Sequence, residues 1–186
     1  TDNGNVSLIG NATAADGVVD ADRDPGSATI TMAAGTTLNA GTGSVTIEMR
    51  DGAGNTNTDT GDITLGNITA DQLTLTHNGG SGSIVQNTGD ALTVTAATTI
   101  DAGPGKDIAL AENGNDFSVA SVSAGNNVTL VDANDIDLGT STVSGTLDVT
   151  AGGNITDSGD VSVSGATTVA AGSGNDITLD QSGNDF

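Results

Sequence analysis

The chain has 186 residues and a formal net charge of −21, because 24 acidic residues stand against three Lys and Arg. This charge excludes a nucleic-acid binder, since neutralising phosphates requires Lys and Arg, and it disfavours contact with an anionic membrane surface. The chain also lacks cysteine, and no apolar run approaches the length that spans a bilayer, so neither disulfides nor direct membrane insertion is expected.

Short strands separated by polar turns are expected along most of the chain, because 22 of the 24 acidic residues are Asp, which is typical of turns and caps. Residues 3–9 predict a strand, and residues 10–27 predict an Asp-rich inserted loop, so residues 1–27 form an irregular N-terminal part. Residues 28–186 predict one continuous repeat region. The first strands of this region are expected at 30–32, around 38 and at 45–47, and a polar loop follows at 50–61. Further strands are expected at 62–65, around 68, at 73–76, around 84, at 92–95, around 100 and at 107–110, and the same pattern continues to residue 186.

The strongest signal in this region is an internal repeat. Residues 98–117 (TTIDAGPGKDIALAENGNDF) return at 167–186 as TTVAAGSGNDITLDQSGNDF, an offset of 69 in residue number (167 − 98), and a looser copy lies at 36–49. A repeated unit that cannot bury its own apolar face must stack on its neighbours. The repeat therefore indicates a stacked architecture.

A shorter period gives the expected length of one coil. Apolar residues at 128, 130 and 136 recur at 147, 149 and 155, each shifted by 19 in residue number. In coils of this length, equivalent strands stack in parallel about 4.8 Å apart. A sandwich core normally contains Trp or Tyr, and this chain has neither. The sequence therefore predicts an all-β parallel β-helix (β-solenoid) with roughly 19–23 residues per coil and a 69-residue super-repeat.

Residues 145–156 (GTLDVTAGGNIT) and 167–179 (TTVAAGSGNDITL) resemble the repeats of filamentous-haemagglutinin-like adhesins, which are large secreted bacterial surface proteins. The resemblance covers residues 28–186 and consists of a strand, an Ala-Gly-Gly turn and a second strand. It implies a right-handed parallel β-helix, export through an outer-membrane partner and a role as a stalk in attachment. The chain begins at Thr1 without a signal peptide, which indicates a mature product or a fragment.

The candidate metal ligands are four acidic residues of the inserted loop: Asp16, Asp20, Asp22 and Asp24. Alternating carboxylates in a loop suit Ca²⁺, a hard cation that prefers oxygen ligands. An EF-hand is excluded, because Pro25 and Thr31 stand where that loop has Gly and Glu. The sequence leaves two interpretations, an irregular calcium site and a solvated acidic loop.

Three other features are expected to be structural. His77 is the only histidine, is expected in an exposed loop, and cannot build a Ser-His-Asp triad or a nitrogen-ligated metal site with partners from this sequence. Phe117 and Phe186 hold the same place in the two copies and are expected to pack at a corner or in the core. Asp107 and Asp176 are expected to cap local backbone at a corner, although AGSGNDITL (171–179) partly matches the nonapeptide of calcium-binding β-rolls.

These features predict a non-enzymatic structural segment, a stalk or passenger, of a secreted bacterial surface adhesin, located outside the cell. The alternative is a subunit of a self-assembling extracellular filament or surface layer, because the open ends of a parallel helix are unpaired strand edges. Calcium would bridge acidic flanks in either case, and the expected partners are further copies, other surface proteins or glycans. Ice binding is less favoured because Thr-x-Thr pairs do not recur in each coil. Sugar cleavage is also less favoured, because aromatic and basic residues are scarce.

Overall fold

The computed structural model describes residues 3–23 and 26–186, and within them no helix is long and apolar enough to cross a membrane. Two short 3₁₀ turns, η1 (Ala14–Asp16) and η2 (Asp20–Asp22), lie in the inserted loop. The strands are β1 (Val6–Gly10), β2 (Ala28–Thr31), β3 (Thr37–Asn39), β4 (Ser44–Met49), β5 (Thr60–Leu65), β6 (Asn67–Ala70), β7 (Gln72–His77), β8 (Ile84–Gln86), β9 (Leu92–Asp101), β10 (Ile108–Leu110), β11 (Asp116–Ala124), β12 (Val128–Asp132), β13 (Ile136–Leu138), β14 (Ser141–Val143), β15 (Leu147–Ala151), β16 (Ile155–Asp157), β17 (Val161–Val163), β18 (Thr167–Ala171) and β19 (Ile177–Thr178).

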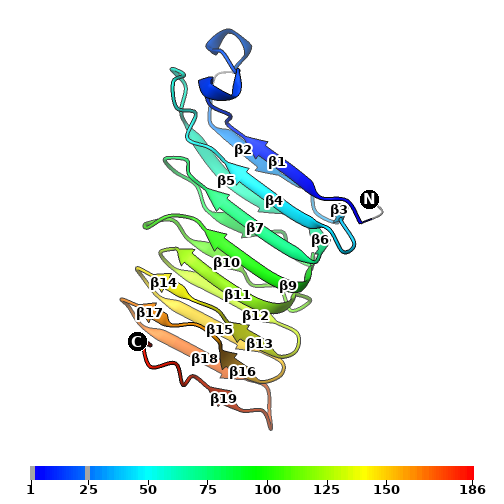
Figure 1. Cartoon of the computed structure of the whole chain (residues 1–186), viewed down its shortest axis with the longest axis vertical. Helices are drawn as coiled ribbons and strands as arrows, with labels where there is room; N and C mark the ends of the chain where they lie inside the picture. The colour runs from blue at the N-terminus through cyan, green and yellow to red at the C-terminus, as the bar shows by residue number, and fades with distance from the viewer. Residues whose placement is uncertain (1–2, 24–25) are drawn as a thin grey trace.

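Every strand-to-strand ladder in the described part of the chain is parallel. One sheet has the order β18-β15-β12-β10-β8-β5-β2, a ten-stranded sheet runs from β1 and β3 to β19, and β14 pairs with β17. Strands that lie side by side in a sheet are separated in the sequence by strands of the other sheets, so the chain winds around a common axis. Figure 1 shows the coils stacked from the N-terminal end in blue to the C-terminal end in red. The predicted β-solenoid is confirmed.

The register between strands gives the length of each coil. Val128 lies opposite Leu147 and Leu147 opposite Thr167, so the residue number advances by 19 over one coil and by 20 over the next. At the N-terminal end Val6 lies opposite Val45, an advance of 39 (45 − 6), because the inserted loop leaves the coil between β1 and β2. Loop length changes the number of residues in a coil without changing the register of the strands that flank it.

Inward side chains form continuous columns along the axis. Ile47, Leu75, Ile100 and Val122 lie in register in the ten-stranded sheet, and each is at most 1% exposed. Burying an aliphatic side chain of this size contributes roughly 1.5–3 kcal/mol. One coil holds few of these residues, so it depends on contact with the next coil to offset the entropy of ordering its backbone.

Asn and Asp at the corners hydrogen-bond from one coil to the next. Asp107 Oδ1 accepts a hydrogen bond from the Asn127 N–H at 3.0 Å, which lowers the pKa of Asp107. At a second corner Asp135 Oδ1 accepts from the Asn154 N–H at 2.6 Å, and Asn154 Oδ1 accepts from the Asp176 N–H at 2.9 Å. The expectation that Asp107 caps local backbone is therefore wrong, because parallel stacking brings the next coil within reach of its side chain.

The Asn of the repeated Gly-Asn-Asp-Phe sequence joins coils in the opposite direction. Asn115 Oδ1 accepts the Leu92 N–H at 2.9 Å, and Asn184 Oδ1 accepts the Val161 N–H at 2.8 Å, each across 23 residues. Asn115 is fully buried and also exchanges two amide hydrogen bonds with Gln86, at 2.7 and 3.0 Å. Asn115 thus satisfies a backbone donor inside the core.

We expect Asn115→Ala to lower the free energy of unfolding by about 2–4 kcal/mol, because it leaves the buried Leu92 N–H without a partner and removes both hydrogen bonds to the Gln86 amide, whose NH₂ keeps only the Asp90 carbonyl. Urea unfolding followed by circular dichroism measures this change. Asn184→Ala is the matched control, since it removes the same repeat residue from the last coil and should cost about 1 kcal/mol. Equal losses in the two variants would contradict a structural role for the buried Asn115 network.

The 69-residue repeat does not coincide with a whole number of coils. Ile108 begins β10 in the seven-stranded sheet, whereas the corresponding Ile177 begins β19 in the ten-stranded sheet. Three coils from Ile108 lead through Val128 and Leu147 to Thr167, an advance of 59 in residue number (167 − 108), so the longer repeat adds one further side of the coil. The repeated segment is therefore a strand–corner–strand unit that is used at different corners of the solenoid.

Candidate functional site

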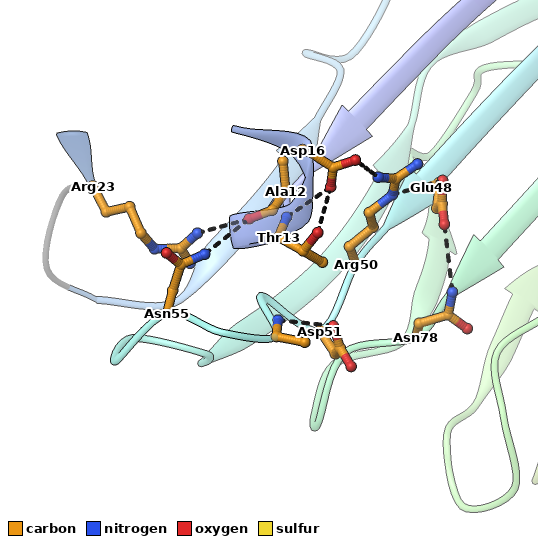
Figure 2. Close-up of polar contacts among 10 residues, drawn as sticks. Ala12, Thr13, Asp16, Arg23, Glu48, Arg50, Asp51, Asn55 and Asn78 are labelled. Atoms are coloured by element: carbon orange, nitrogen blue, oxygen red, sulfur yellow. Dashed lines mark hydrogen bonds and ion pairs between the residues drawn. The ribbon is translucent and has the colours of Figure 1, made fainter. Parts of the chain in front are cut away.

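The inserted loop, which lies between β1 and β2, is attached to the solenoid by a polar cluster around Arg50, which follows β4 (Figure 2). Asp16 forms an ion pair with Arg50 and accepts hydrogen bonds from the backbone N–H and the hydroxyl of Thr13, at 2.8 and 2.7 Å. Arg50 Nε also lies 3.1 Å from Glu48 Oε2. The hydrogen bond from Arg50 holds the pKa of Asp16 well below its usual range, and both carboxylates raise the pKa of Arg50.

Arg23 anchors the other side of the loop. Its guanidinium donates to the Ala12 carbonyl at 3.0 Å, to the Asn57 carbonyl at 2.6 Å and to the Asn11 side-chain oxygen. These residues line an open pocket of about 290 Å³. Two of the three basic residues in the sequence thus hold the inserted loop in place.

The structure does not gather the predicted calcium ligands at one point. Asp16 is engaged in the Arg50 cluster, while Asp20 accepts a hydrogen bond from the Thr56 N–H at 2.8 Å, which lowers the pKa of Asp20. Asp22 is exposed, and Asp24 lies outside the described residues. Across residues 3–23 and 26–186, no three His, Asp or Glu side chains converge as a metal centre requires. Calcium binding by the loop stays a prediction.

His77 is buried, which corrects the expectation of an exposed loop residue. It ends β7 at 1% exposure and shares the inward face with Leu73 and Leu75, so the Asn-Gly-Gly turn begins only after it. Its Nε2 lies 2.9 Å from the Gly61 carbonyl, and its Nδ1 is buried without a hydrogen-bond partner. Burial lowers the pKa of His77, and the nearby Lys106 ammonium lowers it further.

We expect His77 to make the fold sensitive to mild acid. Its folded pKa lies below the unfolded value of about 6.5, so its contribution to stability is present above pH 6.5 and is lost as pH falls through the folded pKa. Thermal unfolding between pH 7 and pH 5 measures the effect. Burial raises the pKa of Asp132, so the contribution of Asp132 to stability has the opposite sign: it is present below the unfolded value of about 4 and is lost as pH rises through the folded pKa. His77→Gln keeps a donor toward Gly61 and should flatten this pH dependence, whereas an unchanged profile would exclude His77 as its source.

A second hollow, of about 380 Å³, lies beside β13 and is lined by acidic, amide and hydroxyl side chains with Ile136. Asp135, Asp137 and Asp116 all line it. Asp135 is already used in the bond to the Asn154 N–H, and one Asp137 oxygen is buried without a partner. No basic or aromatic side chain is part of this lining.

A row of hydroxyl residues crosses five strands and was not apparent from the sequence. Its members lie in register on β1, β4, β7, β9 and β11: Ser7, Thr46, Thr74, Thr99 and Ser121. The Thr-x-Thr pair of β7 does not recur beside it, because Glu48 and Asp101 lie opposite Thr76. From β4 to β7 and from β7 to β9 the residue number advances by 28 and then by 25, so no single period in the sequence aligns the row.

Comparison with protein families gives one match, to a family described as "Repeats of unknown function (DUF5649)", at residues 52–124 and 125–186. These two segments make up most of the chain. The chain belongs to this family. The first DUF5649 segment contains β5 to β11 and the second contains β12 to β19, so a family unit spans several coils and the two segments meet where β11 ends. Neither the curated proteins nor the solved structures contain a match.

Proposed function

We propose that the chain is a rigid spacer, a non-enzymatic structural segment of a secreted bacterial surface adhesin. The observation that carries the proposal is the continuous series of parallel ladders from β1 to β19 in the ten-stranded sheet. In such a stack each coil contacts only its neighbours, so the length grows by one strand spacing per coil. A spacer needs this property, because its task is to hold two points at a defined distance.

Rigidity follows from the hydrogen bonds and columns between coils. Bending the stack opens backbone hydrogen bonds on one side and separates inward side chains such as Ile63, Ile84 and Ile108, which lie in register and are at most 1% exposed. Close-packed protein interiors resist deformation. The long loops leave the coil at its corners, so they alter the surface without interrupting the stack.

The surroundings of the spacer are inferred from charge and from the family resemblance. A net charge of −21 repels neighbouring molecules and keeps them apart in solution. The resemblance of residues 145–156 and 167–179 to filamentous-haemagglutinin-like repeats supports a place at the bacterial cell surface. The partners would be other surface proteins or glycans.

Coil duplication tests the spacer directly. Inserting a second copy of residues 108–166 after residue 166 keeps the register, because Ile108 and Thr167 begin strands of the same sheet three coils apart. The maximum dimension in small-angle X-ray scattering should increase by about 15 Å, which is three strand spacings. A control with a Gly- and Ser-rich insertion of equal length in the loop at 51–59 adds the same amount of chain without adding coils.

A duplicated chain that gains no length would contradict the spacer. The control should show the scattering of a flexible loop and no longer rod, because a Gly- and Ser-rich insertion behaves as a random coil. The adhesin context is tested separately, by treating intact source cells with protease and probing with antibodies against residues 28–186. We expect the signal to disappear from intact cells, as a surface protein requires, and a protected signal would rule out surface display.

A further inference from the structure

A small polar hollow lies where the inserted loop meets the ends of β4 and β7. Its volume is about 280 Å³, and the residues that line it are Thr13, Glu48, Arg50, Asp51 and Asn78. All of these residues have polar or charged side chains, and Figure 2 shows them in and beside the Arg50 cluster. The lining therefore suits a polar ligand and not an apolar one.

Successive coils bring these residues together. β4 and β7 pair as far as Met49 and His77, so Arg50 and Asn78, the next residues, leave the sheet side by side. The Asn78 N–H donates to the Met49 carbonyl at 2.8 Å and continues the ladder by one step. Thr13 comes from the inserted loop, which follows β1 in the preceding coil. The hollow is therefore formed by the fold, and no short stretch of the sequence contains it.

The walls of the hollow are held in place before any ligand arrives. The Thr13 hydroxyl donates to Asp16 at 2.7 Å, and Asp16 forms the ion pair with Arg50. On the other side, Asp51 Oδ1 accepts a hydrogen bond from the Ala53 N–H at 2.9 Å. A site with fixed walls loses little conformational entropy on binding.

Several hydrogen-bonding groups at the hollow are unused. Among residues 3–23 and 26–186, no hydrogen bond is made by Arg50 Nη2, the Asn78 side-chain oxygen or Asp51 Oδ2. The Asn78 amide nitrogen has one long contact, 3.5 Å, to Glu48 Oε1. Asp51 and Asn78 are exposed, so a ligand can reach both. The hollow offers donors and acceptors together, because a guanidinium donates, a carboxylate accepts and an amide does both.

The charges of the lining exclude several classes of ligand. The guanidinium of Arg50 repels a metal cation, and the carboxylates of Glu48 and Asp51 repel phosphate, sulfate and acidic sugars. Asp16 and Glu48 already balance the charge of Arg50, so it does not attract a further carboxylate. A hydroxyl group is neutral and both donates and accepts. A neutral ligand with several hydroxyl groups therefore matches the lining.

We propose that this hollow binds one neutral hexose unit of a glycan through its hydroxyl groups. Asp51 accepts from the sugar, Arg50 donates to it, and the Asn78 amide does both. The volume lies at the small end of ligand pockets, which span about 300–1,000 Å³, so it holds one sugar ring and not a longer chain. The site adds a binding function to the spacer and does not depend on it.

The affinity of the site should be low. Sugar sites gain much of their affinity from an aromatic ring, but the chain has no Trp or Tyr and no Phe lines the hollow. Open hydrogen bonds alone predict a dissociation constant of about 1–10 mM. Binding of this strength becomes useful when many copies on one surface meet many sugars on another.

A sugar titration of the isotope-labelled full chain, followed by NMR, tests the site. The probes are the methyl glycosides of glucose, galactose, mannose and N-acetylglucosamine, each added up to about 50 mM. At least one of them should shift the Asn78 side-chain amide and Arg50 Nε signals along a saturable curve. Sialic acid and glycine, which carry charges that the lining does not match, should leave these signals unchanged.

Two variants and a matched control locate the binding. Asn78→Ala should weaken binding at least threefold, the cost of a lost hydrogen bond. Asp51→Asn keeps the acceptor for the Ala53 N–H but replaces the free carboxylate oxygen, and it should weaken binding similarly. Asn113→Ala is the control, because Asn113 is also an exposed Asn before Gly but lies outside the hollow, and it should bind as the unaltered chain does.

The proposal is overturned if none of the methyl glycosides gives a saturable shift at Asn78 and Arg50. Tighter binding of sialic acid or glycine would also overturn it, because the ligand would then be charged. Equal effects of Asn78→Ala and Asn113→Ala would place the sugar elsewhere and refute this site. None of these results changes the scattering expected of the spacer, so the two proposals fail separately.

Discussion

Replacing Phe117 with alanine should lower the free energy of unfolding by about 3–5 kcal/mol, the cost of deleting a large buried aromatic side chain. Phe117 is fully buried in β11, where it lies opposite Val94, and its N–H donates to Asp132 at 2.6 Å. The substitution leaves a cavity in the middle of the stack. Because a repeat protein is stabilised by contacts between successive coils, the cavity should also uncouple the N-terminal and C-terminal halves and split urea unfolding into two transitions.

The sequence contains its own control for this experiment. Phe186→Ala removes the same residue from the same place in the repeat, but Phe186 is 52% exposed. This variant should lose less than about 1 kcal/mol and keep a single transition. Equal losses in the two variants would show that burial by the next coil does not distinguish the two positions.

The second large effect is expected from Gly82→Ala. Gly82 has φ +97°, and a Cβ at this position would lie 2.2 Å from the Gly61 carbonyl oxygen and 2.3 Å from its carbon. The obstacle is backbone of the neighbouring coil, which cannot move away as a side chain can. We expect a loss of about 3 kcal/mol or more, from backbone strain together with separation of the two coils. Thermal unfolding and hydrogen exchange at Ser83, whose N–H donates to Asp62 at 2.8 Å, would report it.

Gly89→Ala separates the two causes. Gly89 also has a positive φ, +83°, but nothing lies within 4 Å of a Cβ added there, so this variant contains only the backbone strain, about 1–2 kcal/mol. The difference between the variants measures the close approach of the coils. If Gly82→Ala cost no more than Gly89→Ala, the coils would not be packed backbone to backbone at this corner.

Much of the fold was accessible from the sequence because the information is local. Alternating apolar residues such as Leu73 and Leu75 predict a strand whatever its neighbours are, and the regular recurrence of apolar positions from 128–136 to 147–155 predicts the length of a coil. The inserted loop and the polar loop after Arg50 were also predicted, since neither contains a periodic apolar pattern.

The candidate site was less accessible, because its contacts join residues far apart in the chain. The four loop carboxylates suggested calcium, yet Asp16 pairs with Arg50, which lies 34 residues away. A composition with three basic residues does not indicate that one of them occupies this carboxylate. His77 was assigned to an exposed loop from its Asn-Gly-Gly neighbours, whereas the strand continues one position further and turns the ring inward.

By itself the sequence determined that this protein is a stack of short strands with an aliphatic interior, because periodicity and turn residues act over a few positions. The tertiary structure decided which side of the coil each copy of the repeat occupies, which Asn and Asp join successive coils, and which of two equivalent phenylalanines is buried. These properties depend on summed coil lengths and on the presence of a neighbouring coil. Phe117 and Phe186 have the same local sequence, Gly-Asn-Asp-Phe, and only stacking distinguishes them.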